Sequence, residues 1–176
     1  ASGKNPTESA TPRRMVGYGC NTEIRKDGSM MKNQYQELRA RQQAELNAFP
    51  LIFAFSDKQF EEGMHKLGLT IKDTCQMCSI GAGGYCRKSD APKLNEMFRR
   101  HRKELWDAIK GDATGQGFIQ DMFLCELNNH EYSYTGEVDE ALDALGITPR
   151  HLTDMPQLRH GLELACTEVM RHDCFG

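Results

Sequence analysis

The stretch from residue 89 to residue 111 constrains the fold most strongly, because it carries every signal of one long amphipathic helix. Ser89 or Asp90 stands at the capping position, and Pro92 lies in the first turn, where its missing N–H costs nothing. Gly111 is a typical helix stop. Apolar positions recur at helical spacing through Leu94, Met97, Phe98, His101, Leu105 and Ala108 or Ile109. A helix with such a stripe must bury it against other elements.

Helical patterns continue through most of the remaining chain. Strong helix formers without Gly or Pro fill residues 32–48. Ser56 and Gln59 form a capping box, and Gly68 ends the helix that they open. Further helices are predicted over residues 118–130 and 137–145, and from Thr148 onward. We therefore expect a mainly α fold, a compact helical single domain over residues 31–176.

A minor β-strand or hairpin element is the expected exception to this helical pattern. Leu51–Phe55 is a short apolar run that follows Pro50 and indicates a buried strand or extended core segment. Helical periodicity disappears around residues 71–88, where glycine dominates and indicates a turn or a small hairpin. The strand element is expected to involve residues 51–55 and 83–87.

Residues 1–30 show neither helical nor strand periodicity. They are rich in Gly, Ser, Thr, Pro and charged residues, a composition that cannot bury a core. Their Ala-Ser and Gly-Ser-Met ends are typical of sequence left by cloning. We expect a flexible or vector-derived extension that contributes nothing to the packing of the domain.

Composition excludes several classes of function. The formal net charge of −3 gives no global reason to expect a polyanionic partner. The longest apolar run, Leu51–Phe55, is far too short to span a membrane, so no membrane partner is expected. The first thirty residues lack the apolar segment of a secretory signal, which favours a cytoplasmic protein. The seven cysteines are odd in number and are expected to be reduced thiols.

Three stretches together resemble an uncharacterised family. They are FAFSDKQFEEGMHKLGL (53–69), GGYCRKSDA (83–91) and LNNHEYSYTGEVDEALDALGIT (127–148). The chain resembles a small family of gut Gram-positive bacteria and their phages or other mobile elements, over roughly residues 31–165. This resemblance implies no established activity. The cysteines at 75, 78 and 86 are not expected of that family generally, so it implies no family-wide metal site.

Cys75, Cys78 and Cys86 form the strongest metal-binding candidate. The first two make a Cys-x-x-Cys pair, which can chelate zinc, and Cys86 could add a third thiolate. A structural zinc site needs four ligands, and no second such pair closes it. The simpler interpretation is no cofactor and a glycine-rich turn leading into the helix at Ser89. Cys86 would then point into an apolar cluster with Leu51–Phe55.

A basic stretch over residues 87–103 raises the possibility of nucleic-acid binding. It holds seven Arg or Lys side chains, Arg99 and Arg102 among them, against two acids. Arg and Lys side chains in such a helix can contact phosphates. The competing interpretation is that they face the acidic residues 121–145. No interleaved aromatic residues expected to be exposed, and no known motif, favour the nucleic-acid interpretation.

The segment Asn128–Gly136 gathers many hydrogen-bonding groups in nine residues. His130, Glu131, Tyr132 and Tyr134 are its candidate binding residues. His130 would be the general base of a hydrolase, with Glu131 as its partner. Adjacent helical residues point about 100° apart, however, and no nucleophile motif accompanies them. A hydrogen-bonded helix terminus, or a polar pair of His130 with His101, is the alternative.

These observations favour a non-enzymatic accessory protein of a phage, a mobile element or a bacterium. It would act by binding a macromolecular partner, most simply another protein. The alternatives are a small zinc-binding protein or hydrolase that uses the cysteines or His130, and a nucleic-acid binder that uses residues 87–103.

Overall fold

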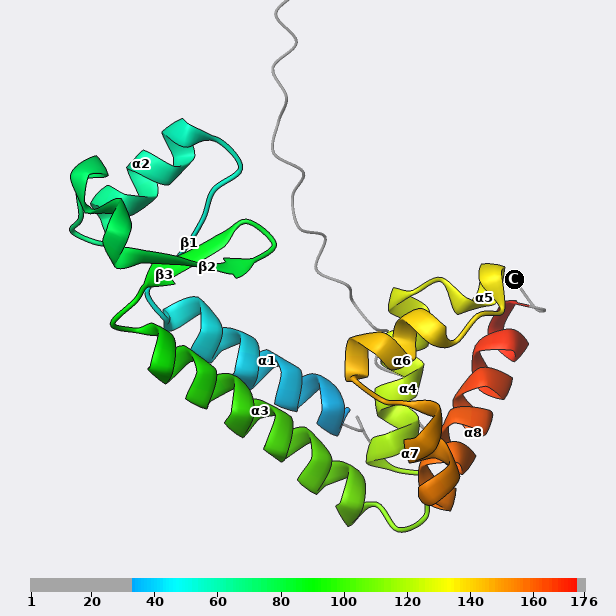
Figure 1. Cartoon of the computed structure of the whole chain (residues 1–176). Helices are drawn as coiled ribbons and strands as arrows, with labels where there is room; N and C mark the ends of the chain where they lie inside the picture. Colours follow the sequence, from blue (N-terminus) through cyan, green and yellow to red (C-terminus); the bar gives the residue numbers. More distant parts are fainter. Residues whose placement is uncertain (1–32, 174–176) are drawn as a thin grey trace, which may run out of the picture.

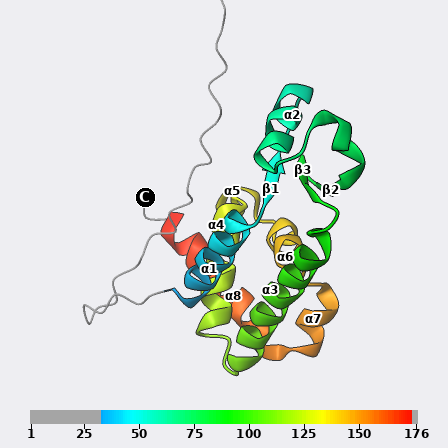
Figure 2. The same ribbon diagram turned by 90° about the vertical axis from the view of Figure 1, so that its left-hand side faces the viewer.

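The computed structural model describes residues 33–173 and is mainly helical with a small three-stranded antiparallel sheet. The predicted fold class is therefore confirmed. Helices α1 (Gln34–Ala48) and α3 (Ala91–Gly111) lie side by side in both views and form what we call the arm (Figures 1 and 2). The sheet lies at one end of the arm and helices α4 to α8 at the other. The prediction for residues 1–30 lies outside the described residues.

The chain between the two arm helices folds into what we call the sheet lobe, residues 51–88. Its elements are β1 (Leu51–Phe53), α2 (Asp57–Lys66), the 3-10 helix η1 (Ile71–Gln76), β2 (Met77–Gly81) and β3 (Gly84–Arg87). β3 is the central strand and pairs antiparallel with both neighbours. The predicted strands at 51–55 and 83–87 correspond to β1 and β3. Only half of the predicted capping box is present, because the Gln59 N–H donates to the Ser56 hydroxyl whereas the Gln59 side chain accepts from the Phe55 N–H instead of the Ser56 N–H.

The two faces of the sheet pack on different helices, because successive residues of a strand point to opposite sides. Ile52 and Tyr85 are partners in the β1–β3 ladder and face α2. Leu51 and Cys86 are the next partners and face the arm. The cluster on α2 holds Ile52, Met64, Leu67 and Met77, and the cluster on the arm holds Cys86, Leu94 and Met97 with Leu46, Phe49 and Leu51. Cys86 thus meets Leu51 in an apolar cluster, as predicted.

At the other end of the arm, five helices form what we call the helical bundle. They are α4 (Phe118–Asn129), α5 (Tyr132–Thr135), α6 (Asp139–Leu145), α7 (Pro149–Asp154) and α8 (Pro156–Asp173). The central helix α4 buries Ile119, Met122, Phe123 and Leu127 completely. Tyr35 and Leu38 of α1 join the same apolar cluster, so this end of the arm packs into the core of the bundle.

A carboxylate loop starts α4. Asp112 accepts hydrogen bonds from the backbone N–H groups of Gly115, Gly117 and Ile119 at 2.9, 3.0 and 3.1 Å. Gly117 is the N-cap of α4 and Ile119 lies in its first turn, so Asp112 satisfies N–H groups that the start of a helix leaves without intrahelical partners, and it also binds Gly115 in the preceding loop. Burial by itself raises the pKa of Asp112, but these hydrogen bonds outweigh burial and hold the pKa below its usual value.

Gly161 of α8 and Gly115 in the loop before α4 allow α8 to lie close to the start of α4. A Cβ atom built on Gly161 would stand 2.5 Å from Ile119 Cγ2 and 2.7 Å from the Gly115 carbonyl oxygen. One of these neighbours is backbone, which cannot rotate away as a flexible side chain can. The helix contact that organises the bundle therefore requires glycine at position 161.

We expect Gly161→Ala to lower the free energy of unfolding by about 1–3 kcal/mol, because overpacking forces α8 away from α4. Urea denaturation measures this change. Gly111→Ala is the matched control, since nothing lies within 4 Å of its Cβ position. The control should be as stable as the parent or slightly more so, because alanine favours helix. Equal stability of the two variants would contradict the close contact.

Candidate functional site

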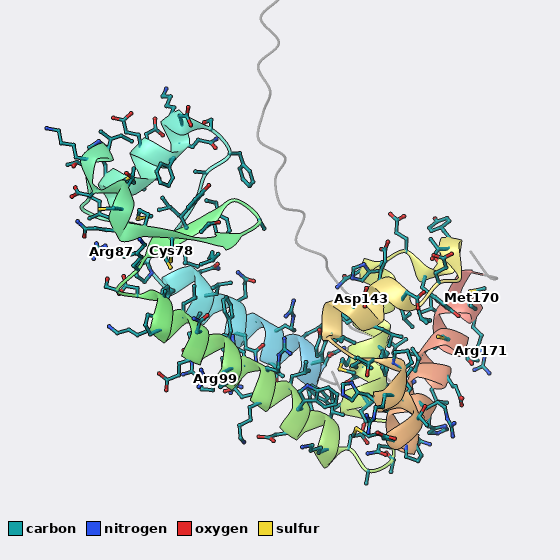
Figure 3. All side chains as sticks on the ribbon, in the orientation of Figure 1. Cys78, Arg87, Arg99, Asp143, Met170 and Arg171 are labelled. Atoms are coloured by element: carbon teal, nitrogen blue, oxygen red, sulfur yellow. The ribbon has the colours of Figure 1, made fainter. Side chains whose placement is uncertain are left out.

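The three candidate metal ligands are not brought together. Cys75 is exposed in η1, whereas Cys78 and Cys86 lie opposite one another on β2 and β3. Their Sγ atoms are 3.4 Å apart, and Figure 3 shows Cys78 where the sheet lobe meets the arm. Among residues 33–173, no group of three or more His, Cys, Asp or Glu side chains is placed to hold a metal ion. The donor set in this region falls short of the four ligands of a structural zinc site.

Much of the predicted basic surface is already engaged in contacts within the chain. Arg87 donates to the Leu67 carbonyl, Arg100 pairs with Glu45 of α1, and Lys103 pairs with Asp107 one turn along α3. None of these partners belongs to the acidic residues 121–145. Arg99 and Arg102 are exposed on α3, and Figure 3 shows Arg99 on the arm. Lys88 and Lys93 of the same stretch are exposed as well.

The histidine segment does not form one site. His130 ends α4, with its Nε2 atom 3.8 Å from Glu126 and its Nδ1 atom 3.4 Å from Glu140. Glu131 adopts a left-handed conformation, with φ of 54°, and starts α5. The Tyr132 hydroxyl donates to Cys166, and this hydrogen bond together with burial raises the pKa of Tyr132. Tyr134 is 89% exposed. These contacts match the alternative of a hydrogen-bonded helix terminus.

The suggested pair of His130 and His101 is wrong, because each histidine binds a different carboxylate. His101 belongs to a polar seam between the arm helices, which we define as Arg41, Gln42 and Glu45 of α1 with Arg100, His101 and Glu104 of α3. The His101 Nε2 atom lies 2.7 Å from Glu45. Arg41 and Gln42 each donate to Glu104 at 3.1 Å. Hydrogen bonds from His101 and Arg100 hold the pKa of Glu45 below its usual value of 4.5.

A buried carboxylate lies at the junction of arm and bundle, where sequence reasoning did not place one. Glu126 of α4 is only 6% exposed and accepts a hydrogen bond from the Tyr35 hydroxyl of α1. Asn129 donates to its other oxygen at 3.3 Å. Burial, and then the adjacent carboxylate, raise the pKa of Tyr35, which keeps the phenol protonated as a donor. The only sequence signal was the position of Glu126 on the apolar face of α4.

An exposed apolar surface on the sheet lobe is the most unusual feature of the described residues. Phe53 is 60% exposed, Phe55 is 79% exposed, and Ile80 is exposed as well. We call these three residues the apolar platform. The expectation that Leu51–Phe55 is buried is wrong for both phenylalanines. It could not be corrected from sequence, since a run without polar residues does not indicate which alternate side chains face solvent.

Glycines of the hairpin shape the apolar platform. Phe53 lies opposite Gly84 in the β1–β3 register, and Ile80 covers the same glycine, with Ile80 Cγ1 2.8 Å from the Cβ position of Gly84. The Phe55 ring lies over Gly83, with Phe55 Cε1 2.5 Å from the Cβ position there. Side chains at 83 or 84 would displace these groups. The glycines of this stretch therefore leave room for exposed apolar side chains.

A family model described as a family of unknown function, DUF7659, matches residues 34–168. This match covers more than half of the chain. The chain belongs to this family. Comparison with curated proteins and with solved structures finds no match. Within the part of the chain that the structure describes, no helix is long and apolar enough to cross a membrane.

We expect Tyr35→Phe to lower the free energy of unfolding by about 1–3 kcal/mol, because it leaves the buried Glu126 with one donor fewer. The double variant Tyr35→Phe with Glu126→Leu removes both partners. It should lose less stability than the two single variants together, as measured by urea denaturation. Strict additivity would mean that the two side chains do not interact.

The polar seam should make stability depend on pH through Glu45. Because its folded-state pKa is lowered, Glu45 stabilises the fold above about pH 4.5 and loses this effect as the pH falls through the folded-state value. Glu45→Gln should therefore be less stable than the parent at pH 7, with the difference shrinking toward pH 3. Urea denaturation at both pH values measures this.

Glu62→Gln is the control for that experiment, because Glu62 lies 3.9 Å from Lys58 on the exposed surface of α2. Exposed pairs of this kind contribute little to stability. If Glu45→Gln lowered the free energy of unfolding equally at pH 7 and pH 3, the carboxylate charge would not be what stabilises the polar seam.

Proposed function

We propose that the protein is a non-enzymatic binding protein and that the apolar platform is its docking surface for another protein. The observation that carries this proposal is the solvent exposure of Phe53 and Phe55, two residues apart on one small lobe. Large apolar side chains that remain exposed together are typical of interaction sites. Aromatic residues also contribute strongly to protein–protein interfaces, because they bury much area at little cost in entropy.

The chemistry of the platform indicates the kind of partner. No charged residue occurs in residues 51–55 or 79–86, which form β1 and the hairpin beneath the three side chains. A surface without charge offers nothing to the phosphates of a nucleic acid, whose binding depends on Lys and Arg. It suits an uncharged apolar segment of a partner protein, which would bury the phenylalanine rings on binding.

The setting of the protein is part of the same proposal. The sequence resemblance supports an accessory role in a gut bacterium, a phage or another mobile element. The cysteines of the described region form no disulfide, which suits the cytoplasm, where thiols stay reduced. A protein of this kind would act by occupying a surface of a host or phage protein, and it needs no catalytic residues of its own.

The exposed arginines on the arm favour one competing function, nucleic-acid binding through Arg99 and Arg102. Binding of this kind weakens steeply as salt concentration rises. We expect no retention of the chain on a DNA or RNA column at physiological salt. Retention that depends on salt and is abolished by Arg99→Glu with Arg102→Glu would favour nucleic acid over a protein partner.

Crosslinking at the platform tests the proposal. A photoreactive phenylalanine analogue replaces Phe55, and crosslinked proteins from the producing cell are identified by mass spectrometry. The same analogue at Tyr134 is the matched control, since that aromatic residue is even more exposed but lies on the helical bundle. A protein crosslinked at position 55 and not at position 134 is then purified for binding measurements.

The decisive measurement is the affinity of that purified protein for the variants. We expect Phe53→Ser with Phe55→Ser to weaken binding at least about tenfold, the effect of losing one hot-spot residue or more. Tyr134→Ser should bind as the parent does. Unchanged affinity of the platform variant would reject the platform as the docking surface. Circular dichroism confirms that each variant is folded.

A further inference from the structure

Cys78 and Cys86 face one another across the hairpin in a position that suits a covalent bond. The Lys88 N–H donates to the Gln76 carbonyl at 2.7 Å, two positions before Cys78 in the same antiparallel register. Cys78 and Cys86 are therefore also a hydrogen-bonded pair, because the two pair types alternate along such a ladder. Cα atoms in these pairs are about 5.5 Å apart, within the range of about 4.4–6.8 Å that disulfides span.

The two sulfur atoms already point toward one another. They are 3.4 Å apart and would have to approach to the bonding distance of about 2.0 Å for a disulfide to form. Cys75, the other cysteine of the Cys-x-x-Cys motif, is exposed in η1, outside the β2–β3 ladder. The motif that stands out in the sequence is thus a different pair from the one that the fold brings together.

The environments of the two thiols differ and assign them different chemical roles. Cys86 is completely buried between the sheet and the arm, and burial followed by its contact with Cys78 raises its pKa to about 11. Cys78 is half-buried and stands on an edge strand, so reagents in solution can reach it. Because the thiolate is the attacking species, Cys78 is the thiol that reacts first and Cys86 the one that closes the bond.

We propose that Cys78 and Cys86 form a reversible intrachain disulfide by exchange with a low-molecular-weight disulfide such as oxidised glutathione. The Cys78 thiolate attacks one sulfur of that disulfide, forms a mixed disulfide and releases one small thiol. The Cys86 thiol then gives its proton to solvent and attacks Cys78 Sγ, which releases the second small thiol. The protein loses two electrons and two protons, and the small disulfide is reduced to two thiols.

The disulfide would tie the edge strand β2 to the central strand β3 beside the arm cluster. Cys86 packs with Leu94 and Met97 of α3, and Ile80 of the apolar platform lies two residues beyond Cys78 on β2. The redox state of the pair would thus set how firmly the hairpin is held. This inference stands on the geometry of the two strands and does not depend on the proposed partner.

One tryptic peptide tests the proposal, because cleavage after Lys72 and Arg87 places Cys75, Cys78 and Cys86 together. The full chain is equilibrated in buffers of rising ratio of oxidised to reduced glutathione, quenched with acid and alkylated. We expect the oxidised peptide to carry a single alkyl group, on Cys75. Its mass should be two hydrogen atoms below that calculated for the same singly alkylated peptide with free thiols at Cys78 and Cys86. Treatment with excess reduced glutathione should restore three alkylated cysteines.

Two variants keep the experiment decisive. Cys75→Ser should form the disulfide as the parent does. Cys78→Ser should leave Cys86 without an internal partner, so the loss of two hydrogen atoms from the tryptic peptide should disappear. Cys78 is half-buried, so this variant does not disturb the buried side of the cluster. A link that includes Cys75, or three alkylated cysteines at the most oxidising ratio, would overturn the proposal.

Discussion

The polar contact between α1 and α3 fixes how the two arm helices lie against one another, and both ends of the described structure attach to this arm. Glu45 receives Arg100 and His101, while Arg41 and Gln42 reach Glu104. Apolar contacts support the arm at its ends: Leu46 and Phe49 pack under the sheet lobe, and Tyr35 and Leu38 pack against the bundle. Between these ends the two helices are matched by hydrogen bonds, which require a specific register where apolar contacts tolerate sliding.

Local signals in the sequence were sufficient for most of the helices. Pro92 and Gly111 bracket α3, and the Ser56 hydroxyl caps the first turn of α2, because these residues act through their own backbone neighbours. The final helical region was harder to divide. Pro156 is the first residue of α8 and directly follows Met155, the C-cap of α7. The break between the two helices therefore falls at a proline, a residue that is also favourable at the first position of a helix.

The candidate sites were less predictable, because they depend on contacts between distant residues. The Cys-x-x-Cys spacing indicated Cys75 with Cys78, yet strand register joins Cys78 to Cys86 instead. Glu126 carries no local sign that a tyrosine 91 residues away will satisfy it. Exposure of Phe53 and Phe55 depends on how far the arm reaches under the sheet, a length that no local pattern encodes. The arm covers Leu51 and Cys86 and leaves the outer part of that face open.

The placement of the sheet lobe between α1 and α3 has a consequence for how the chain folds. The two helices form a hairpin whose connection is the whole of residues 49–90 rather than a short turn. Closing a connection of that length costs more entropy than closing the two- to eight-residue links usual between packed helices. The lobe reduces this cost when it folds, because β1 pairs with β3 and so brings the end of α1 to the start of α3. Pairing of β1 with β3 therefore shortens the effective connection and lowers the entropic cost of bringing the two arm helices together.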